Sequence, residues 1–361
     1  MDDRQGNGEA NKVLIAASGT GGHLFPAIAT AEKLNSTIEW LGVPDRLETE
    51  LVPKRYPLHT VRMGGVQGKL GLGTLKILAQ LVQATLATRH LLKQGQFQGV
   101  FTTGGYIAAP AIIAARSLGL PTVLHESNAM PGKVTRWLSR WCSLVAIGFN
   151  ETRQYLPKQV KTECVGTPVR SQFFADSNAS LTDLAIPDNA PLIVVVGGSQ
   201  GAVAVNKLVR AAAPDWFDAG VWVVHQTGTN DPDTESLNHV QYIHRPFFKN
   251  VAALFKRANL VISRAGAGTL TELAMTHTPS ILIPYPFAAD DHQAYNANAF
   301  GNVGASKVYR QSELNGDTLK NRVLTLLDTP EELDCMRVAA AELAVNDSAD
   351  RLAELLEKMM G

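Results

Sequence analysis

Glycine clusters stand at four places where an apolar segment gives way to a segment with helical character. They are Gly19–Gly22, Gly104–Gly105, Gly197–Gly201 and Gly266–Gly268. Glycine lets the backbone approach a ligand closely and adopt angles that other residues resist. The N–H groups and the positive dipole end at the start of a helix favour an anion. One such turn is commonly only a tight turn, but four together predict a ligand with one or two phosphates.

Side chains near these turns have the types that a transfer reaction on such a ligand needs. His23 follows the first cluster, where a helix N-terminus disfavours the imidazolium and leaves a base that can take a proton. Hydrogen bonding within the turn is the alternative role. Arg170 and Ser199 could contact a diphosphate, with Arg170 making charge-assisted bonds. Glu272, expected in the first turn of the helix after Gly268, could accept two ribose hydroxyls or compensate the helix dipole.

Two other chemistries fit the spacing poorly. A nicotinamide site needs G-x-G-x-x-G and an acidic residue about 20 positions later, whereas Gly19-x-Gly21-Gly22-His23 breaks that pattern. Asp290 and Asp291 invite a metal hypothesis, but paired Asp before a helix is more simply an N-terminal cap. Helix N-termini and Arg170 could neutralise phosphates without a metal, and Gln293 could hydrogen-bond sugar hydroxyls.

Short apolar strands and helices alternate along most of the chain and position these turns. Expected strands include Lys12–Ala17, Val100–Thr103, Leu192–Val196 and Leu260–Ser263, and expected helices include Pro26–Leu34 and Leu72–Lys93. Such alternation predicts parallel sheets covered on both faces. The polar stretch 171–191 interrupts it. We therefore expect two doubly wound domains joined near residue 170, with the ligand beyond the carboxyl ends of the strands, in the cleft between the domains.

Composition limits the class of protein. The 361 residues suit about two domains, and a formal net charge of zero gives no indication of nucleic acid. Residues 1–170 hold 19 Lys and Arg against 11 Asp and Glu, which suits an anionic partner or merely uneven solvated faces. Three scattered cysteines are typical of a reducing cytosol. Residues 1–11 are too polar for a signal peptide and are expected to be a disordered lead-in.

Two segments combine apolar or aromatic side chains with basic ones. The expected helix Leu72–Lys93 is strongly apolar with basic residues at its edges, and Lys133–Trp141 holds two tryptophans among three cations. Together they could dock on an anionic bilayer. A core stripe beside a solvated face is the alternative.

Six motifs, in this order, resemble those of the bacterial UDP-N-acetylglucosamine:lipid I N-acetylglucosaminyltransferases, the MurG family. They are Gly19-Thr-Gly-Gly-His23-x-x-Pro26, Gly104-Gly-Tyr106, His125-Glu126-x-Asn128, Gly166-x-Pro-Val-Arg170, Gly197-Gly-Ser-Gln-Gly201 and His292-Gln293-x-x-Asn296-Ala297. Any one would be weak support, but the six in order are specific. The resemblance covers about residues 12–355.

The resemblance implies a GT-B fold, in which two Rossmann-like doubly wound domains face a deep inter-domain cleft. Residues 12–168 would be the N-terminal acceptor and membrane-facing domain, and residues 169–335 the C-terminal UDP-sugar donor domain. Residues 336–361 would be a C-terminal helix that could pack back on the N-terminal domain.

The resemblance also implies the reaction. An inverting transfer would move N-acetylglucosamine from UDP-N-acetylglucosamine to the C4 hydroxyl of MurNAc in undecaprenyl-pyrophosphoryl-MurNAc-pentapeptide, turning lipid I into lipid II for peptidoglycan. No metal or other cofactor would be needed. The enzyme would sit peripherally on the cytoplasmic face of the plasma membrane, with anionic lipid and cell-wall synthesis or division proteins as further partners and no nucleic acid.

Site residues follow from the resemblance position by position. His23 matches the proposed base. The donor-contacting or substrate-contacting positions are Thr20, Gly21, Gly22, Asn128, Arg170, Ser199, Phe248, Ala267, Gly268, Thr269, Glu272 and Gln293. Phe248 would meet uracil through its backbone, Glu272 the ribose and Gln293 the sugar hydroxyls. Ser127, Ala108-Ala109, Thr167 and Ala294 depart from the usual family residues, which affects fine acceptor and sugar contacts rather than the reaction.

Two alternatives of other classes remain at this stage. One is a GT-B glycosyltransferase with a different acceptor, such as diacylglycerol. The other is a non-catalytic UDP-sugar-binding scaffold protein of the division machinery, which the intact His23 argues against.

Overall fold

The structure, a computed structural model, describes residues 11–19, 21–64, 72–174, 181–198 and 201–361. Two compact units contain these residues. The N-terminal unit lies within Met1–Ser127, Pro131–Pro168 and Asp347–Gly361, and the C-terminal unit within Asn128–Met130 and Val169–Asn346. Residues 1–10 of the expected lead-in, Thr20 and Ser199 lie outside the described residues.

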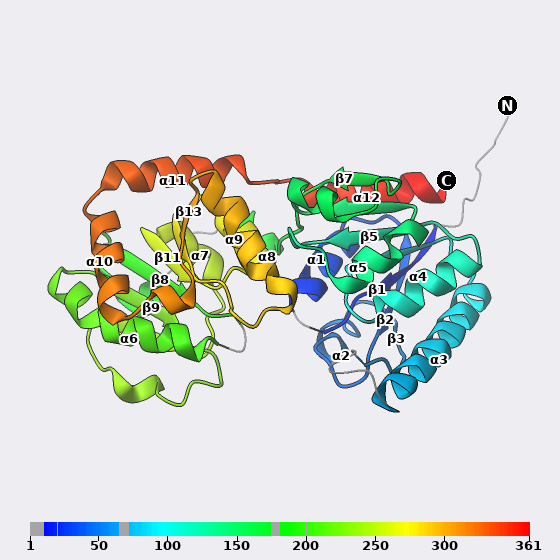
Figure 1. The fold of residues 1–361 in the computed structure, drawn as a ribbon, viewed down its shortest axis with the longest axis horizontal. Coiled ribbons are helices and arrows are strands. Elements are labelled where there is room, and N and C mark those ends of the chain that lie inside the picture. The colour runs from blue at the N-terminus through cyan, green and yellow to red at the C-terminus, as the bar shows by residue number, and fades with distance from the viewer. Residues whose placement is uncertain (1–10, 20, 65–71, 175–180, 199–200) are drawn as a thin grey trace. The chain divides into compact units, whose positions relative to one another are not determined.

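The N-terminal unit is a parallel sheet with helices on both faces (Figure 1). Its strands are β1 (Lys12–Ala16), β2 (Thr37–Gly42), β3 (Leu58–Thr60), β4 (Gly99–Thr102), β5 (Thr122–Glu126), β6 (Leu144–Ile147) and β7 (Thr162–Cys164). Its helices are α1 (Gly21–Ala31), α2 (Glu48–Leu51), α3 (Leu72–Gln94), α4 (Ala108–Ser117), α5 (Lys133–Leu138) and α12 (Ser348–Met360). The expected helix Leu72–Lys93 is confirmed, whereas the first helix begins at Gly21 and not at Pro26, because Pro26 is tolerated inside α1.

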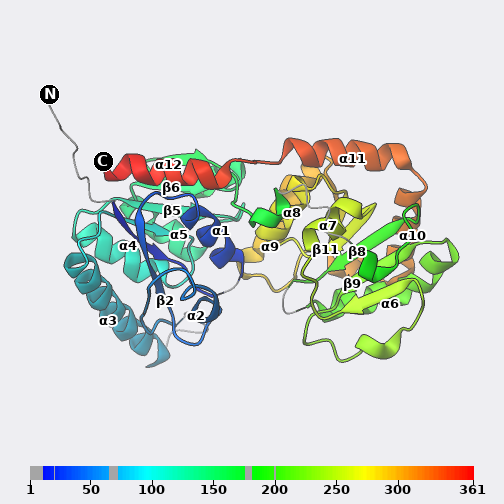
Figure 2. The same ribbon diagram turned by 180° about the vertical axis from the view of Figure 1, so that it is seen from behind.

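The core of this unit follows the alternation of side chains along its strands. Val13 and Ile15 of β1 pack with Leu24 of α1 and Leu352 of α12. Leu14 points to the opposite face and packs with residues of α3 and α4. Figure 2 shows α1 and α12 on the near side of this sheet. The last helix of the chain therefore completes the core of the N-terminal unit.

The C-terminal unit is built on the same plan. Its strands are β8 (Leu192–Val196), β9 (Trp222–Gln226), β10 (Tyr242–Arg245), β11 (Leu260–Ser263), β12 (Ser280–Leu282) and β13 (Ser306–Val308). Its helices are α6 (Val203–Asp218), α7 (Val251–Arg257), α8 (Ala267–Met275), α9 (His292–Asn302), α10 (Gly316–Leu327) and α11 (Pro330–Glu342). Ile193 and Val195 of β8 pack with Trp216 of α6, Leu319 of α10 and Met336 of α11. Helix α7 packs against β8 and α9 against β13.

Strand order confirms the predicted pair of doubly wound parallel sheets. Among the described residues the first sheet has the order β3-β2-β1-β4-β5-β6-β7, and the second the order β10-β9-β8-β11-β12-β13. Every pairing in both is parallel. The order reverses between β1 and β4 in the first sheet and between β8 and β11 in the second. Such reversal points are where open α/β sheets bind ligands.

Among the described residues, no helix combines the length and the apolar character needed to cross a bilayer.

Candidate functional site

The four glycine turns follow the four strands that flank the two reversal points. In the N-terminal unit Gly19 comes after β1, and Gly104 and Gly105 come after β4. In the C-terminal unit Gly197, Gly198 and Gly201 come after β8, and the turn ending at Gly266 comes after β11. A parallel sheet presents the carboxyl ends of its strands at one edge, so each unit places two of these turns side by side.

His23 lies in the first turn of α1 and is fixed by the turn after β4. Its Nδ1 lies 2.6 Å from the carbonyl oxygen of Thr103, and the Thr103 hydroxyl donates to the carbonyl oxygen of His23 at 2.9 Å. A carbonyl oxygen can only accept, so the Nδ1–H donates. The neutral imidazole therefore carries its lone pair on Nε2. This tautomer has a proton acceptor at Nε2, as a general base requires.

Gly105 forms the surface beside that lone pair. Its φ of +73° is in the left-handed region, and a Cβ built on it would lie 3.7 Å from Nε2 of His23. A side chain here would be strained and would lie in van der Waals contact with the proton-accepting atom, occupying the space beside it. The glycine thus keeps open the space that an incoming hydroxyl needs.

Glu48 of α2 is a buried residue whose role no sequence motif predicts. Its Oε2 accepts the N–H of Gly19 at 3.1 Å, and its Oε1 accepts the N–H of Val43 at 2.9 Å. The side chain is fully buried. The carboxylate therefore ties the first glycine turn to the end of β2. Because the Glu48 carboxylate already accepts the N–H of Gly19, an anion at this turn must be bound by other groups.

The end of β5 holds two further buried polar side chains. His125 donates from Nε2 to the carbonyl oxygen of Gly166 at 2.9 Å, and burial lowers the pKa of His125. Glu126 Oε2 accepts the N–H of Gly132 at 3.0 Å and the Thr135 hydroxyl at 2.7 Å. Both residues fix loops of the N-terminal unit. His125 therefore has a structural role.

In the C-terminal unit, the turn after β8 is packed directly against the loop after β9. Gly201 has φ +81°, and a Cβ on it would lie 2.3 Å from the carbonyl oxygen of Thr227. Asn206 of α6 donates to that same oxygen at 2.8 Å and to Asp231 at 2.7 Å. Gly201 is therefore required for packing, and the two loops form one wall at this edge of the sheet.

A buried polar network, which was not predicted from the sequence, holds these two loops together. Arg210 makes a bidentate ion pair with Asp231 at 2.7 and 3.1 Å. Burial alone would raise the pKa of Asp231, but hydrogen bonds from Arg210 and Asn206 outweigh it and lower the pKa to about 2. His225 lies between Asn206 Oδ1 at 3.0 Å and the Tyr242 hydroxyl at 2.8 Å. These residues come from α6, β9, β10 and a loop, so only the fold brings them together.

Helix α8 presents its N-terminus after β11. Ala267, Gly268 and Thr269 are its first three residues, and Gly266 precedes them with extended backbone. The N–H groups of a first helical turn lack partners within the helix and suit an anion. The three residues predicted to contact the donor thus share one helix start.

Glu272 is not in the first turn of α8, as the sequence had predicted, but in the second. The expectation failed because the helix begins at Ala267, ahead of Gly268. Dipole compensation at the helix start is therefore not its role. Its Oε1 accepts from the guanidinium of Arg170 at 2.7 Å. Burial raises the pKa of Glu272, and Arg170 offsets part of this effect.

Phe248 is buried, and its N–H donates to Gln226 Oε1 at 3.1 Å. The guanidinium of Arg245 lies 5.3 Å from the centre of its ring. Gln226, the last residue of β9, was likewise not predicted from the sequence. It fixes the backbone whose predicted role is to meet uracil.

Gln293 and Asn128 are each held by a neighbour in the C-terminal unit. Gln293 Oε1 accepts the N–H of Tyr285 at 2.9 Å. Asn296, fully buried, donates to Asn128 Oδ1 at 3.1 Å and accepts the N–H of Ala129 at 2.8 Å. The motif that begins at His292 therefore contains Gln293, a predicted sugar contact, and Asn296, which holds the predicted substrate contact Asn128.

In the part of the chain that the structure describes, no group of three or more His, Cys, Asp or Glu side chains is arranged to hold a metal ion.

Comparison with known proteins matches both units to one family. Residues 13–147 match the glycosyltransferase family 28 N-terminal domain, and residues 192–352 match the glycosyltransferase family 28 C-terminal domain. The chain is 62% identical to a UDP-N-acetylglucosamine–N-acetylmuramyl-(pentapeptide) pyrophosphoryl-undecaprenol N-acetylglucosamine transferase of Trichormus variabilis over 350 residues, which cover 97% of this chain and 98% of the relative.

Solved structures agree with this match. The crystal structure of Acinetobacter baumannii MurG superposes with a TM-score of 0.79 at 29% identity, covering 96% of this chain and 99% of that one. The calicheamicin glycosyltransferase CalG4 superposes with a TM-score of 0.71 at 15% identity, covering 98% of each chain. At that identity the second likeness speaks for the fold alone.

Proposed function

The chain belongs to the family of UDP-N-acetylglucosamine–N-acetylmuramyl-(pentapeptide) pyrophosphoryl-undecaprenol N-acetylglucosamine transferases, and from this premise we propose that it converts lipid I to lipid II. It is a UDP-N-acetylglucosamine-dependent glycosyltransferase of GT-B fold, acting in peptidoglycan synthesis. N-acetylglucosamine moves to the C4 hydroxyl of MurNAc with inversion at the anomeric carbon. The observation that carries the proposal is the match at 62% identity along 97% of the chain.

The C-terminal unit, residues 169–335 in the sequence-based division, is the proposed donor domain. Its support is the pair of turns at the β8/β11 reversal point, where the start of α8 offers backbone N–H groups to a diphosphate. Glu272 and Phe248 are the proposed ribose and uracil contacts, and Gln293 the proposed sugar contact. Arg170 and Ser199 complete the proposed diphosphate contacts.

The Arg170–Glu272 ion pair supports placing both residues in one binding surface. The two groups lie 2.7 Å apart, so a ribose that bonds to the carboxylate would bring its diphosphate close to the guanidinium. Glu272→Ala should weaken UDP binding measured by calorimetry. An unchanged dissociation constant would refute the ribose assignment.

The N-terminal unit, residues 12–168 in the same division, is the proposed acceptor domain. His23 is the proposed general base, and Gly21, Gly22 and Thr20 are proposed substrate contacts, as is Asn128, which falls within residues 12–168 of that division but belongs to the C-terminal unit of the structure. The support for His23 is its tautomer, because the Nδ1–H bond to Thr103 leaves the lone pair on Nε2.

The step balances without a metal or other cofactor. The acceptor C4 oxygen forms a bond to the anomeric carbon as the bond from that carbon to the UDP oxygen breaks, and the hydroxyl proton passes to Nε2 of His23. The leaving diphosphate gains negative charge, which preorganised N–H groups and Arg170 stabilise.

The N-terminal unit also has a surface suited to lipid. On α3, Leu78, Val82 and Leu86 recur every four residues and are between 51% and 62% exposed. Trp137, 71% exposed, and Trp141, 44% exposed, stand beside the basic residues of Lys133–Trp141. Helix α4 contacts both α3 and α5, so the two segments share one side of the sheet. Exposed apolar side chains bordered by cations are typical of a surface that docks on anionic lipid.

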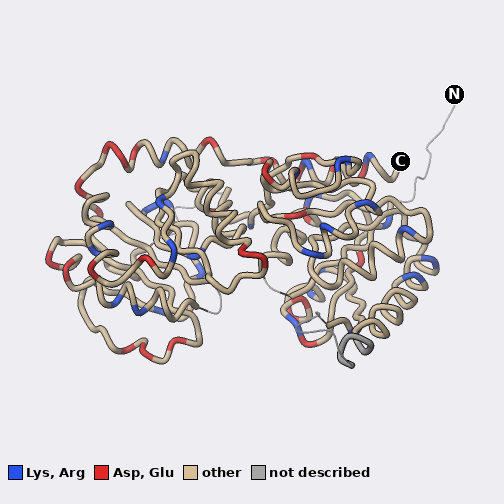
Figure 3. Tube along the Cα trace, viewed as in Figure 1, with Lys and Arg blue, Asp and Glu red and all other residues tan. Residues whose placement is uncertain are grey.

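The charged residues in the sequence of α3 are basic, and Figure 3 shows blue positions along this helix. Peripheral attachment to the cytoplasmic face of the plasma membrane follows as part of the proposal, with cell-wall synthesis and division proteins as further partners. Leu86→Ser and Trp137→Ser should reduce flotation with anionic vesicles, and salt should reduce wild-type flotation. Val338→Ser, at a 63% exposed site on α11, is the control. Equal flotation of all three variants would refute this surface.

One assay tests the reaction itself. UDP release from UDP-N-acetylglucosamine is measured with a lipid I analogue, with diacylglycerol and with neither. Stimulation by the lipid I analogue supports the proposal. Stimulation by diacylglycerol instead would indicate another acceptor class, and tight UDP binding without turnover would indicate a binding protein.

A further inference from the structure

The loop between β12 and α9 contains a turn with unusual backbone geometry. Asp290 and Asp291 have φ of +52° and +53°, a region that non-glycine residues adopt at some cost in free energy. Asp291 directly precedes α9, whose second residue is Gln293. The contacts that hold this turn therefore also set the position of Gln293 at the start of α9.

Different contacts hold the two ends of the loop. Arg264 donates to the carbonyl oxygens of Ile283 and Pro284 at 3.1 and 3.2 Å, which fixes the beginning. At the far end, Arg310 donates from its two terminal nitrogens to Oδ1 and Oδ2 of Asp291 at 2.9 and 2.8 Å. Such a bidentate pair fixes direction as well as distance.

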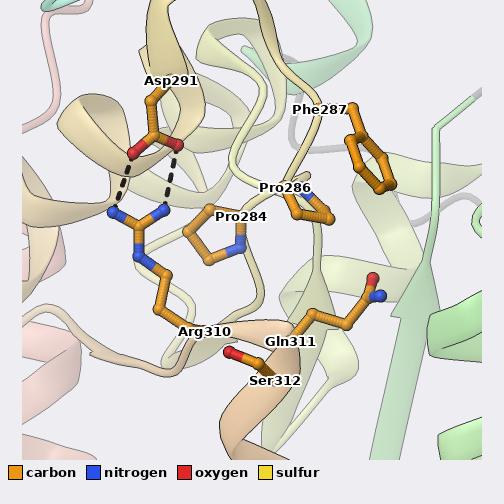
Figure 4. A pocket seen from close by; sticks show the side chains of 7 residues that line it. All are labelled: Pro284, Pro286, Phe287, Asp291, Arg310, Gln311 and Ser312. Atoms are coloured by element: carbon orange, nitrogen blue, oxygen red, sulfur yellow. Dashed lines mark hydrogen bonds and ion pairs between the residues drawn. The ribbon is translucent and has the colours of Figure 1, made fainter.

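A pocket of about 450 Å³ adjoins this ion pair. It is lined by Pro284, Pro286, Phe287, Asp291, Arg310, Gln311 and Ser312. In Figure 4 the guanidinium of Arg310 points at the carboxylate of Asp291, while Phe287 stands on the other side of the view. Because open space adjoins the turn here, the ion pair rather than close packing restrains Asp291 on this side.

We propose that Arg310 is a positioning residue for the donor sugar, acting through Asp291 on Gln293. This inference rests on the proposed function, in which Gln293 contacts the sugar hydroxyls. Gln293 Oε1 already accepts the N–H of Tyr285, so its amide N–H groups are the ones to meet the sugar. Arg310 fixes the start of α9 and so orients the amide N–H groups of Gln293. Through this orientation Arg310 contributes to the preference for N-acetylglucosamine over its C4 epimer.

The test compares ligands with and without the sugar. Dissociation constants for UDP and UDP-N-acetylglucosamine are measured by calorimetry on the full chain and on Arg310→Ala. Loss of an exposed bidentate pair should weaken UDP-N-acetylglucosamine about two- to fivefold and leave UDP unchanged. The ratio of kcat/KM for UDP-N-acetylglucosamine over UDP-N-acetylgalactosamine should fall by a similar factor. Equal weakening of both ligands, or of neither, would overturn the inference.

Three further variants separate the possible outcomes. Arg322→Ala removes a nearby cation that stacks on Tyr309 at 5.4 Å, and both affinities should stay at wild-type values. Asp291→Asn keeps a residue type that tolerates the left-handed region but loses the charge and one of the two acceptor oxygens. It should weaken binding of UDP-N-acetylglucosamine by no more than Arg310→Ala does, and the double variant should bind no more weakly than Arg310→Ala. Additive losses in the double variant would refute action through this pair.

Gln293→Ala distinguishes failure of the inference from failure of the proposed function. It should weaken UDP-N-acetylglucosamine and not UDP. If it does so while Arg310→Ala has no effect, only the role of Arg310 falls. If Gln293→Ala changes neither ligand, the sugar contact in the proposed function falls, and the role of Arg310 falls with it.

Discussion

His225 should make the C-terminal unit sensitive to mild acid. The side chain is fully buried, and burial lowers its pKa from 6.5 to about 3, with Arg210 adding to the effect. The oxygen of Asn206 can only accept, so Nε2–H of His225 donates to it and Nδ1 accepts from Tyr242. Burial and the nearby Arg210 disfavour a second proton on the ring, which is why the imidazole stays neutral.

The direction and size of the change in the free energy of unfolding follow from proton linkage. The folded pKa is lowered, so between pH 6.5 and 3 the unfolded chain binds a proton that the folded chain does not. Stability from this group is therefore present above pH 6.5 and lost as pH falls. Between pH 7 and pH 5 the loss is about 2 kcal/mol in the free energy of unfolding.

Urea unfolding at pH 7 and pH 5 measures this loss, followed by tryptophan fluorescence, to which Trp216 and Trp222 contribute from the C-terminal unit. His225→Gln keeps one donor and one acceptor but does not titrate, so its change between the two pH values should be smaller than that of wild type by about 2 kcal/mol. His277→Asn, at an exposed left-handed position, should behave as wild type. If His225→Gln shows the full wild-type change, the reasoning about the buried imidazole is wrong.

Three other substitutions test the site. Asp231→Asn leaves the buried charge of Arg210 uncompensated and should lower the free energy of unfolding in urea by about 3–5 kcal/mol. As a control, substitution of the exposed Asp215, which lies on the same helix as Arg210, by Asn should lower it by less than about 0.5 kcal/mol. Gly105→Ala should lower turnover at least about tenfold without changing UDP affinity in calorimetry, because φ is +73° and the new methyl occupies the space beside Nε2 of His23; normal turnover would contradict the proposed space for the acceptor. His23→Ala should lower turnover roughly 10²–10⁴-fold with donor affinity unchanged, and near-normal turnover would remove it as the base.

Much of the fold could be predicted because it depends on local patterns. The apolar run of Leu192–Val196 and the glycines that follow it specify a buried strand and a turn without reference to the rest of the chain. Helix limits were less predictable. Pro26 marked an expected start for the first helix, yet α1 begins five residues earlier, at Gly21. The same kind of error put Glu272 in the first turn of α8.

The residues that sequence reasoning missed share a physical feature. Glu48, Gln226 and Asn206 lie far in sequence from the turns they hold, and each is buried with its polar atoms bonded to backbone groups. An isolated Glu or Asn in the sequence looks like a solvated surface residue, which is the commoner case. Of these three residues only Asn206 could have been suspected from the sequence. It is far from the loop at Thr227 that it holds, but it follows the third glycine cluster closely, on the helix expected there.

These buried side chains bear on how the glycine turns would bind the ligand proposed above. A turn rich in glycine is flexible in isolation, and ordering it when a ligand binds would cost conformational entropy. Glu48 holds Gly19, and Asn206 with Asp231 and Arg210 holds the loop that packs on Gly201, so the backbone at these two glycines is restrained by the protein itself. Electrostatic stabilisation of a leaving diphosphate depends on such preorganisation. The variant Asp231→Asn therefore bears on catalysis as well as on stability, because a wall that opens would present the same N–H groups at a greater entropic cost.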